Sequence, residues 1–345
     1  MNAFKKITHS NFFIKLTSWE YWPFGIVQFP IIVYYLWLSL RSRSLVFFSA
    51  SNPGITMGGM FGESKYDVLK KIPAQYIART ILVEVPSSKG AVLQKLQSEG
   101  FTLPVIFKPE LGERGHMVKR ITTEEDIDWY LKNIRINFLV QDLIDLPLEF
   151  GIFYMRYPSQ QNGKVTSVVK KEMLSVTGDG ETTLGQLVLR KDRAKLQWEK
   201  LKETFKDRLD QVVPKGKTIE LVSIGNHALG TKFLNGNDLI DERLSKVFDQ
   251  ISKKIDGFYF GRFDIRTASL NDLYAGNIKI LELNGCGAEP AHIYDPDFRL
   301  FSALAILFRH WKNIFEIARE NHKLGLKFIS HKEGLFYYRK FKAAK

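Results

Sequence analysis

Two apolar segments in the last third of the chain, residues 257–265 and 277–283, most constrain how it can fold. Asp264 lies in the first segment, while Glu282 and Asn284 stand two positions apart around the end of the second. Side chains two apart on a strand point to the same side of a sheet. If the two segments pair as neighbouring strands, these three oxygen-bearing side chains converge on one surface. Such hard oxygen ligands suit Mg²⁺ bound to phosphate oxygens, although the pattern is also that of an ordinary charged strand face.

Length and composition indicate a folded protein that attracts anions. A chain of 345 residues can form two or three lobes, and 45% hydrophobic with 25% charged residues is typical of a globular domain. The formal net charge of +13 favours nucleotides, acidic substrates, nucleic acid or anionic lipid as partners. Because no basic motif is interleaved with aromatic residues, nucleic acid is not expected. The single cysteine, Cys286, excludes an internal disulfide framework and fits a cytoplasmic location.

Residues 24–40 form an almost wholly apolar stretch near the N-terminus. Aromatic residues precede it and Arg41 and Arg43 follow it, which is typical of anchors at a membrane interface. Its 17 residues, with Gln28 and Pro30 among them, fall short of the ~20 that a spanning helix needs. We therefore expect a helix that is buried or lies at an interface, ahead of a true span. Peripheral membrane association through residues 19–43 stays open.

Strand and helix patterns alternate along the chain, but not as strict βαβ units, which predicts the α+β class. The expected strands are 45–48, 80–85, 105–107, 117–121, 137–141, 148–157, 165–174, 217–223, 258–265 and 277–283. The expected helices are 64–71, 87–99, 123–132, a segment from 184, 191–206, 241–255 and 298–318. We expect an N-terminal region (1–80) with a hydrophobic helix and a Gly-rich loop, a main domain (81–330) whose small lobe spans about 105–175, and a basic, solvated tail (331–345).

Several basic residues have the setting of a phosphate site. Lys108 ends a predicted strand beside a loop that contains Gly112 and Gly115, so its ammonium group can reach phosphate while the loop presents backbone N–H groups. Lys170 and Lys171 point to opposite faces of one strand, so only one of them can face a nucleotide. Lys171 is the preferred candidate.

These motifs occur in an order that resembles one family. The matching segments are Val105-Ile106-Phe107-Lys108-Pro109 with Gly112-x-Arg114-Gly115, then Val140-Gln141-Asp142 and Glu149, Lys170-Lys171, the turn Gly178-Asp179-Gly180, the segment containing Asn226 and Gly230, and finally Arg262, Asp264, Glu282 and Asn284. Over residues 82–296 the chain resembles ATP-grasp carboxylate–amine ligases, nearest the branch of cyanophycin synthetase and the D-alanine–D-alanine ligases. The resemblance implies two α+β lobes that sandwich ATP.

The resemblance also implies roles for individual residues. ATP would be held by Lys108, Gly112, Arg114, Gly115, Gln141, Asp142, Leu143, Glu149 and Lys171. Two Mg²⁺ ions, with Mn²⁺ as an alternative, would bind Asp264, Glu282 and Asn284. The implied reaction activates a carboxylate as an acylphosphate, which an amine then attacks, and Arg262 or Arg266 would stabilise the charge that develops.

The substrate side departs from the family pattern. The loop at 285–296 lacks the Pro-Gly-containing turn of the D-alanine–D-alanine ligases, so we expect a different small-molecule carboxylate and amine. Candidates for substrate contact are Asn226, Glu289 and His292, with Tyr294 beside them. Two alternatives to the ligase remain: an ATP-grasp phosphotransferase that forms no amide bond, and a non-catalytic, membrane-docked nucleotide-binding protein.

Overall fold

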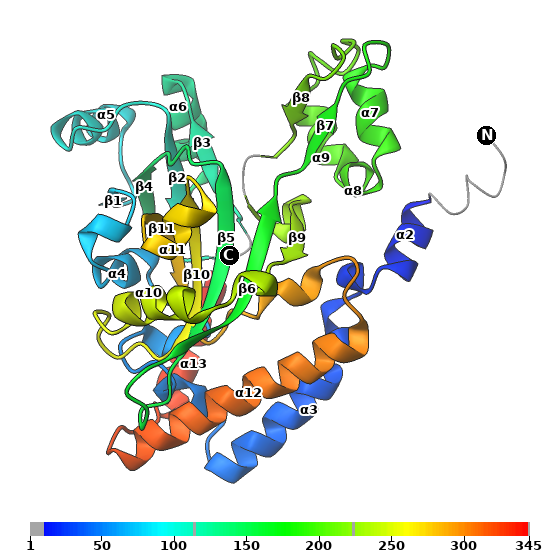
Figure 1. The fold of residues 1–345 in the computed structure, drawn as a ribbon. Helices are drawn as coiled ribbons and strands as arrows, with labels where there is room; N and C mark the ends of the chain where they lie inside the picture. The colour runs from blue at the N-terminus through cyan, green and yellow to red at the C-terminus, as the bar shows by residue number, and fades with distance from the viewer. Residues whose placement is uncertain (1–9, 113–114, 223–224, 344–345) are drawn as a thin grey trace.

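The computed structural model describes residues 10–112, 115–222 and 225–343 (Figure 1). Its named strands form three sheets in which every pairing is antiparallel. Helices pack on the faces of these sheets rather than crossing over between parallel strands. The predicted α+β class is therefore confirmed.

The first sheet has the order β1-β4-β2-β3. Its strands are β1 (Thr80–Val83), β2 (Val105–Pro109), β3 (Lys119–Ile121) and β4 (Phe138–Asp142). The helices α5 (Lys89–Ser98) and α6 (Glu124–Asn133) share a hydrophobic core with it. A capping box formed by Thr123 and Asp126 begins α6 at its predicted start.

The second sheet has the order β11-β10-β5-β6-β9. Its strands are β5 (Leu148–Met155), β6 (Lys164–Glu172), β9 (Lys232–Asn235), β10 (Phe260–Thr267) and β11 (Ile278–Asn284). The strands β5 and β6, expected in the small lobe, thus pair with β10 and belong to this sheet. Long-range strand pairing, which the local pattern does not encode, decides their place.

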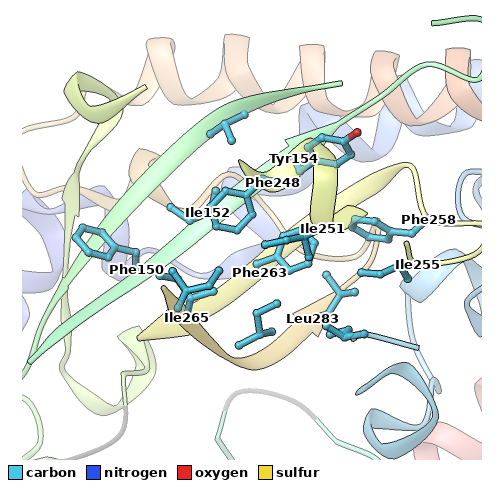
Figure 2. Close-up of a cluster of buried hydrophobic side chains, with 14 of the residues drawn as sticks. Phe150, Ile152, Tyr154, Phe248, Ile251, Ile255, Phe258, Phe263, Ile265 and Leu283 are labelled. Carbon is cyan, nitrogen blue, oxygen red and sulfur yellow. The ribbon is translucent and has the colours of Figure 1, made fainter. Parts of the chain in front are cut away.

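One face of the second sheet packs on three helices, whereas the other carries polar groups and, at one end, apolar residues that pack on the long helix near the C-terminus. Ile152 and Tyr154 of β5 lie with Phe263 of β10 in a buried cluster that includes Phe248 and Ile251 (Figure 2). The helices on this side are α4 (Lys65–Lys70), α10 (Glu242–Ser252) and α11 (Leu270–Ala275). Because side chains alternate along a strand, the residues between the core positions all face the opposite side.

A smaller unit follows β6, in the upper right of Figure 1. It contains β7 (Ser175–Thr177), β8 (Thr218–Glu220), α7 (Leu184–Arg190), α8 (Asp192–Lys195) and α9 (Trp198–Thr204) around a core of its own. In the Gly-Asp-Gly turn, the Asp179 carboxylate accepts hydrogen bonds from the backbone N–H groups of Glu181 (2.9 Å) and Thr182 (2.7 Å). The turn therefore begins a helical segment, as the sequence predicts. The single helix expected over 191–206 is instead split into α8 and α9.

The apolar N-terminal stretch forms α3 (Phe24–Ser42), which lies beside α12 (Leu300–Lys323) (Figure 1). Ile31 and Leu38 are buried between them, while α2 (Asn11–Thr17) precedes this pair. In the part of the chain that the structure describes, no helix has the combined length and apolar content of a membrane span. The short 3₁₀ helices are Trp19–Tyr21, Phe47–Ala50, Thr56–Gly59, Ala74–Tyr76, His227–Leu229, Asn237–Leu239 and Ala291–Tyr294.

The basic segment at the C-terminus is folded rather than a solvated tail, since residues 331–343 form α13 (His331–Ala343). The rings of Tyr338 and Phe341 lie 5.7 Å and 6.0 Å from the ring of Phe61. The aromatic residues spaced among the lysines therefore give the segment a packing partner, which the net charge alone does not reveal.

The segment after α3 also differs from the expected strand at 45–48. Phe47 and Phe48 are both buried, whereas a strand with one covered face buries only every second residue. The Gly-rich segment that follows packs backbone against backbone on the loop after β11. Gly59 has φ +76°, and a Cβ there would stand 2.6 Å from the Cα of Gly285. This loop therefore supports the end of β11.

Asn52 joins this segment to β10 through its buried side chain. Its Oδ1 accepts from the N–H groups of Tyr259 and Phe260 (2.9 Å each), and its Nδ2 donates to the carbonyls of Gly58 and Phe260 (2.8 Å each). Substituting Asn52→Ala removes all four hydrogen bonds and takes the acceptor away from the N–H groups of Tyr259 and Phe260, so we expect the free energy of unfolding to fall by more than about 3 kcal/mol. Urea titration measures this. The exposed Asn162, replaced by Ala, is the control and should change it by less than about 0.5 kcal/mol.

Candidate active site

The predicted oxygen ligands meet on the polar face of the second sheet. β10 and β11 pair so that Asp264 stands opposite Glu282 and Arg262 opposite Asn284. The Nδ2 of Asn284 donates to Asp264 Oδ2 at 3.2 Å. The structure therefore brings together the three residues that the strand pattern placed on one surface.

Asp264 is buried at the centre of this group. Arg262 donates to both of its oxygens, from Nε at 3.0 Å and from Nη2 at 3.1 Å, and the Nζ of Lys171 lies 3.3 Å from its Oδ1. Burial alone would raise the pKa of the Asp264 carboxyl group, but Arg262 and Lys171 outweigh it and hold this pKa below its ordinary value. The carboxylate is therefore ionised at neutral pH.

A glycine leaves room for this ion pair. Gly151 of β5 stands opposite Asp264, and a Cβ there would lie 3.1 Å from both Arg262 Cδ and Asp264 Oδ1 and 2.7 Å from Val169 Cγ1. Any larger residue would displace the charged groups. The sequence alone does not single out this glycine, since it lies inside an apolar strand.

Lys171 is the lysine that faces the site. Its Nζ bonds Glu149 Oε1 at 3.0 Å, and only 5% of its side chain is exposed. Burial lowers its pKa, but Asp264 and Glu149 outweigh burial, so the pKa lies above the ordinary value. Lys170 points to the other face and bonds the exposed carboxylate of Asp238 at 3.0 Å. Arg266 also binds Glu149, at 2.9 Å through Nε.

The first sheet contributes Lys108 and Gln141 from adjacent strands. The Nζ of Lys108 donates to Gln141 Oε1 at 3.0 Å and to the Leu281 carbonyl of β11 at 2.9 Å, so the lysine bridges the two sheets. Burial lowers the pKa of Lys108 to about 8, although the negative charge of Glu282 acts to raise it. The Lys108 ammonium group thus lies near the predicted metal ligands.

Lys65 is a member of the site that the sequence did not predict. Its Nζ lies 3.7 Å from Glu282 Oε1 and donates to the backbone carbonyl of Gly112. The residue belongs to the short helix α4, which the sequence predicts over residues 64–71. The only sequence signal would have been its place directly after the Gly-rich segment.

The remaining residues that the sequence predicts for nucleotide binding have no contact with the Asp264 cluster among the contacts described. The carboxylate of Asp142 forms a bidentate pair with Arg79, at 3.0 and 3.1 Å. Leu143 is half-buried directly after β4. Gly115 lies against the side chain of Asn226, whose Oδ1 accepts from the N–H of Ala228 and caps a 3₁₀ turn. Arg114 lies outside the described residues.

The loop after β11 carries Glu289 and His292, both of which the sequence predicts as substrate contacts. The Glu289 carbonyl accepts from Arg262 Nη1 at 3.3 Å, and its carboxylate is held by Gln28 of α3 (Nε2–Oε1 2.6 Å) and by the hydroxyl of Tyr294. The Nδ1 of His292 lies 2.6 Å from Ser167 Oγ, and burial lowers the pKa of His292 to about 4. These contacts therefore tie the loop to α3 and to β6.

A pocket of about 510 Å³ opens between α12 and the face of the second sheet that carries Asp264. It is lined by Phe153, Met155, Tyr157, Lys164, Val165, Thr166, Asn237, Ile240, Phe260, Pro290, His292, Ile306, Arg309, His310 and Asn313. Phe153 stands opposite Arg262 in the sheet, so the pocket begins next to the ion cluster. The buried Nδ1 of His310 has no hydrogen-bond partner among the described residues. Lys164 and Arg309 are exposed and bring positive charge to the pocket.

The donor set is compatible with a hard divalent cation. Asp264 and Glu282 supply carboxylate oxygens from opposed positions, and Asn284 adds an amide oxygen. Within the described ranges, no three His, Cys, Asp or Glu side chains gather in a group that would hold a metal by themselves. Bound phosphate oxygens would therefore have to complete the coordination of an ion here, as is usual for Mg²⁺.

Comparison with known proteins finds similarity at the level of structure. No family model and no curated protein matches the chain. A bifunctional glutathione synthetase from Pasteurella multocida is 16% identical, with a TM-score of 0.37, over 71% of this chain and 36% of that one. The VanG D-Ala:D-Ser ligase from Enterococcus faecalis is 12% identical, with a TM-score of 0.41, over 72% and 61%.

A D-alanine–D-alanine ligase from Coxiella burnetii is also similar, at 12% identity and a TM-score of 0.40, over 84% of this chain and 63% of that one. The chain thus spans between 36 and 63% of the length of these three solved proteins. Each of the three is a ligase or synthetase by name, and the similarity covers 71 to 84% of this chain.

Proposed function

We propose that this protein is an ATP-grasp ligase that joins a small-molecule carboxylate to an amine with hydrolysis of ATP to ADP and phosphate. The observation that supports the proposal best is that basic side chains from two different sheets lie around a pair of carboxylates. Lys108 comes from the first sheet, and Lys171 and Arg262 come from the second, around Asp264 and Glu282. A purely structural ion cluster would not require a buried lysine from each sheet beside a glycine loop.

In this proposal ATP lies between the two sheets. The backbone at Gln141–Leu143 would bind adenine, and Lys108, Lys171 and the loop containing Gly112 and Gly115 would hold the phosphates. Asp264, Glu282 and Asn284 would hold Mg²⁺, which supplies charge neutralisation at the phosphates. Two ions are expected from the family resemblance. We place the reaction in the cytoplasm, where ATP is abundant.

The chemistry proceeds in two balanced steps. A substrate carboxylate oxygen attacks the γ-phosphorus and ADP leaves, which forms an acylphosphate. The amine nitrogen then attacks the acyl carbon, a proton is lost from nitrogen, and inorganic phosphate leaves. Arg262, with Nη1 directed to the substrate-side loop, is the candidate for stabilising the tetrahedral oxyanion. Arg266 is the weaker candidate because it binds Glu149 and the carbonyl of Ile144.

The pocket beside Arg262 is our candidate for binding a substrate. Its volume lies within the range of about 300–1,000 Å³ that is typical of small-molecule sites. Seven of its fifteen lining residues are apolar, Lys164 and Arg309 are basic, and none of the lining residues is acidic. A carboxylate with an apolar body fits this combination.

An ADP-release screen tests the proposal. The purified chain is incubated with Mg²⁺-ATP and pairs drawn from amino acids, amines and small carboxylates, and mass spectrometry of active mixtures identifies the product. We expect ADP and an amide to form in equal amounts. ADP with a phosphorylated product and no amide would instead establish a phosphotransferase, and tight ATP binding without turnover of any pair would favour a non-catalytic binder.

The affinity for ATP should depend on pH through Lys108. Its pKa of about 8 means that the ammonium group is charged below that pH and neutral above it. We therefore expect the Kd for ATP to rise between about pH 7 and about pH 9.5, approaching about tenfold per unit above the pKa. Calorimetric titration with excess Mg²⁺ measures this. In Lys108→Gln the affinity should be lower and nearly independent of pH over this range, and an equally steep rise in that variant would contradict the assignment.

A further inference from the structure

The helix α3 exposes a continuous apolar surface on the side away from α12. Seven large apolar side chains, each 45–77% exposed, line this side: Ile26, Phe29, Ile32, Val33, Leu36, Trp37 and Leu40. Their spacing of three and four residues places them along one face of the helix. We call these seven residues the outer face of α3.

The inner face of the same helix is already occupied. Ile31 and Leu38 are buried, the ring of Tyr34 packs on Phe308, and the ring of Tyr35 packs on Trp311. A helix that is apolar on all sides belongs where all sides are covered, whereas a helix at a water-exposed surface is normally polar on its outer side. An exposed apolar patch of this extent therefore indicates a partner surface.

The charges around the outer face indicate an anionic partner. Residues 24–42 contain no Asp or Glu, and Arg41 and Arg43 follow the apolar positions. The guanidinium groups of Arg41 and Arg319 both lie over the ring of Phe315, at 5.3 and 5.6 Å, so they form a basic cluster at the C-terminal end of α3. Arg41 also lies 4.8 Å from the ring of Trp37, which pairs an interfacial aromatic residue with a cation.

We propose that the outer face of α3 docks the protein onto an anionic lipid bilayer, with the helix parallel to the membrane surface. The packing of the inner face on α12 keeps the helix from leaving the protein, so only its outer half can enter the lipid. Buried apolar area and attraction between the arginines and anionic headgroups together drive such binding.

Docking would bring the active site close to the membrane. Gln28 on the inner face of α3 donates to Glu289, whose carbonyl accepts from Arg262. The substrate-side loop therefore lies across a single helix, about 10–12 Å thick, from the outer face. This arrangement suits a substrate that is itself bound to lipid or released from it.

Vesicle sedimentation of the full chain tests the proposal, with vesicles of phosphatidylcholine alone or mixed with phosphatidylglycerol. We expect binding to the mixed vesicles that salt weakens. The double variant Phe29→Glu with Trp37→Glu should bind at least about tenfold more weakly. Arg41→Glu with Arg43→Glu should also weaken binding to the mixed vesicles by about tenfold. Trp129→Glu, which changes a similarly exposed tryptophan on α6, is the control and should bind as the unaltered chain does.

Two outcomes would overturn the proposal. One is equal sedimentation of the unaltered chain and the α3 double variant. The other is a dimer in light scattering that the double variant converts to a monomer without any vesicle binding, since the outer face would then join two copies of the chain. ADP release is a separate readout, so loss of the ligase assignment would leave a positive sedimentation result intact.

Discussion

Replacing Asp264 by Asn is expected to reduce ADP release by at least about 100-fold. The carboxylate is the central acceptor of the site, contacted by Arg262, Lys171 and Asn284, and its position opposite Glu282 makes it the principal candidate ligand for Mg²⁺. An amide of the same shape keeps an oxygen but removes the negative charge that balances a cation. The loss should therefore appear mainly in kcat, with a weaker response to added Mg²⁺.

The measurement is steady-state ADP release over a range of Mg²⁺ concentrations. Asp238→Asn is the matched control, because that carboxylate is exposed and pairs only with the outward-facing Lys170 among the contacts described. Its activity should remain within about twofold of the unaltered chain. Circular dichroism establishes that the variant is folded. Equal ADP release by Asp264→Asn and the unaltered chain would end the ligase assignment.

Replacing Lys171 by Met should lower the free energy of unfolding by about 3 kcal/mol. The lysine is almost fully buried between Glu149 and Asp264, at 3.0 and 3.3 Å, and its removal leaves two buried carboxylates with less compensation. The same change should weaken ATP binding, because the proposed phosphate ligand would be lost. Urea titration and calorimetry report the two effects separately.

The neighbouring lysine provides the control for this experiment. Lys170→Met removes an exposed ion pair with Asp238 and should change stability by less than about 1 kcal/mol and ATP affinity very little. The two variants differ by one position in the strand and by the face on which the side chain lies. Equal effects of the two substitutions would contradict the placement of Lys171 in the nucleotide site.

Local patterns were enough to predict much of the fold. Thr123 and Thr183 cap α6 and α7, and both helices begin where the sequence predicts a start. The two-residue period around Glu282 and Asn284 correctly predicted a shared face, because alternation along a strand depends only on backbone geometry. The pattern failed at Phe47 and Phe48, which lie in a 3₁₀ helix and are both buried in one hydrophobic cluster.

The parts that could not be predicted depend on contacts between distant segments. Lys65 reaches Glu282 across more than 200 positions, and Gln28 reaches Glu289 across 261 positions. Neither lysine nor glutamine carries a local signal for such a contact. Gly151 is likewise needed only because Arg262 and Asp264 approach it from the neighbouring strand.

The sequence by itself determined most of the candidates for binding metal and phosphate, since residue type specifies the chemistry of a side chain and the strand period specifies which side chains share a face. Only the tertiary structure decided which of them share a site: it selected Lys171 over Lys170, moved β5 and β6 into the second sheet, and left the outer face of α3 uncovered. The physical reason is that strand pairing and the packing of α3 on α12 bring together residues far apart in the chain, and the energies of those contacts are not encoded in any local window.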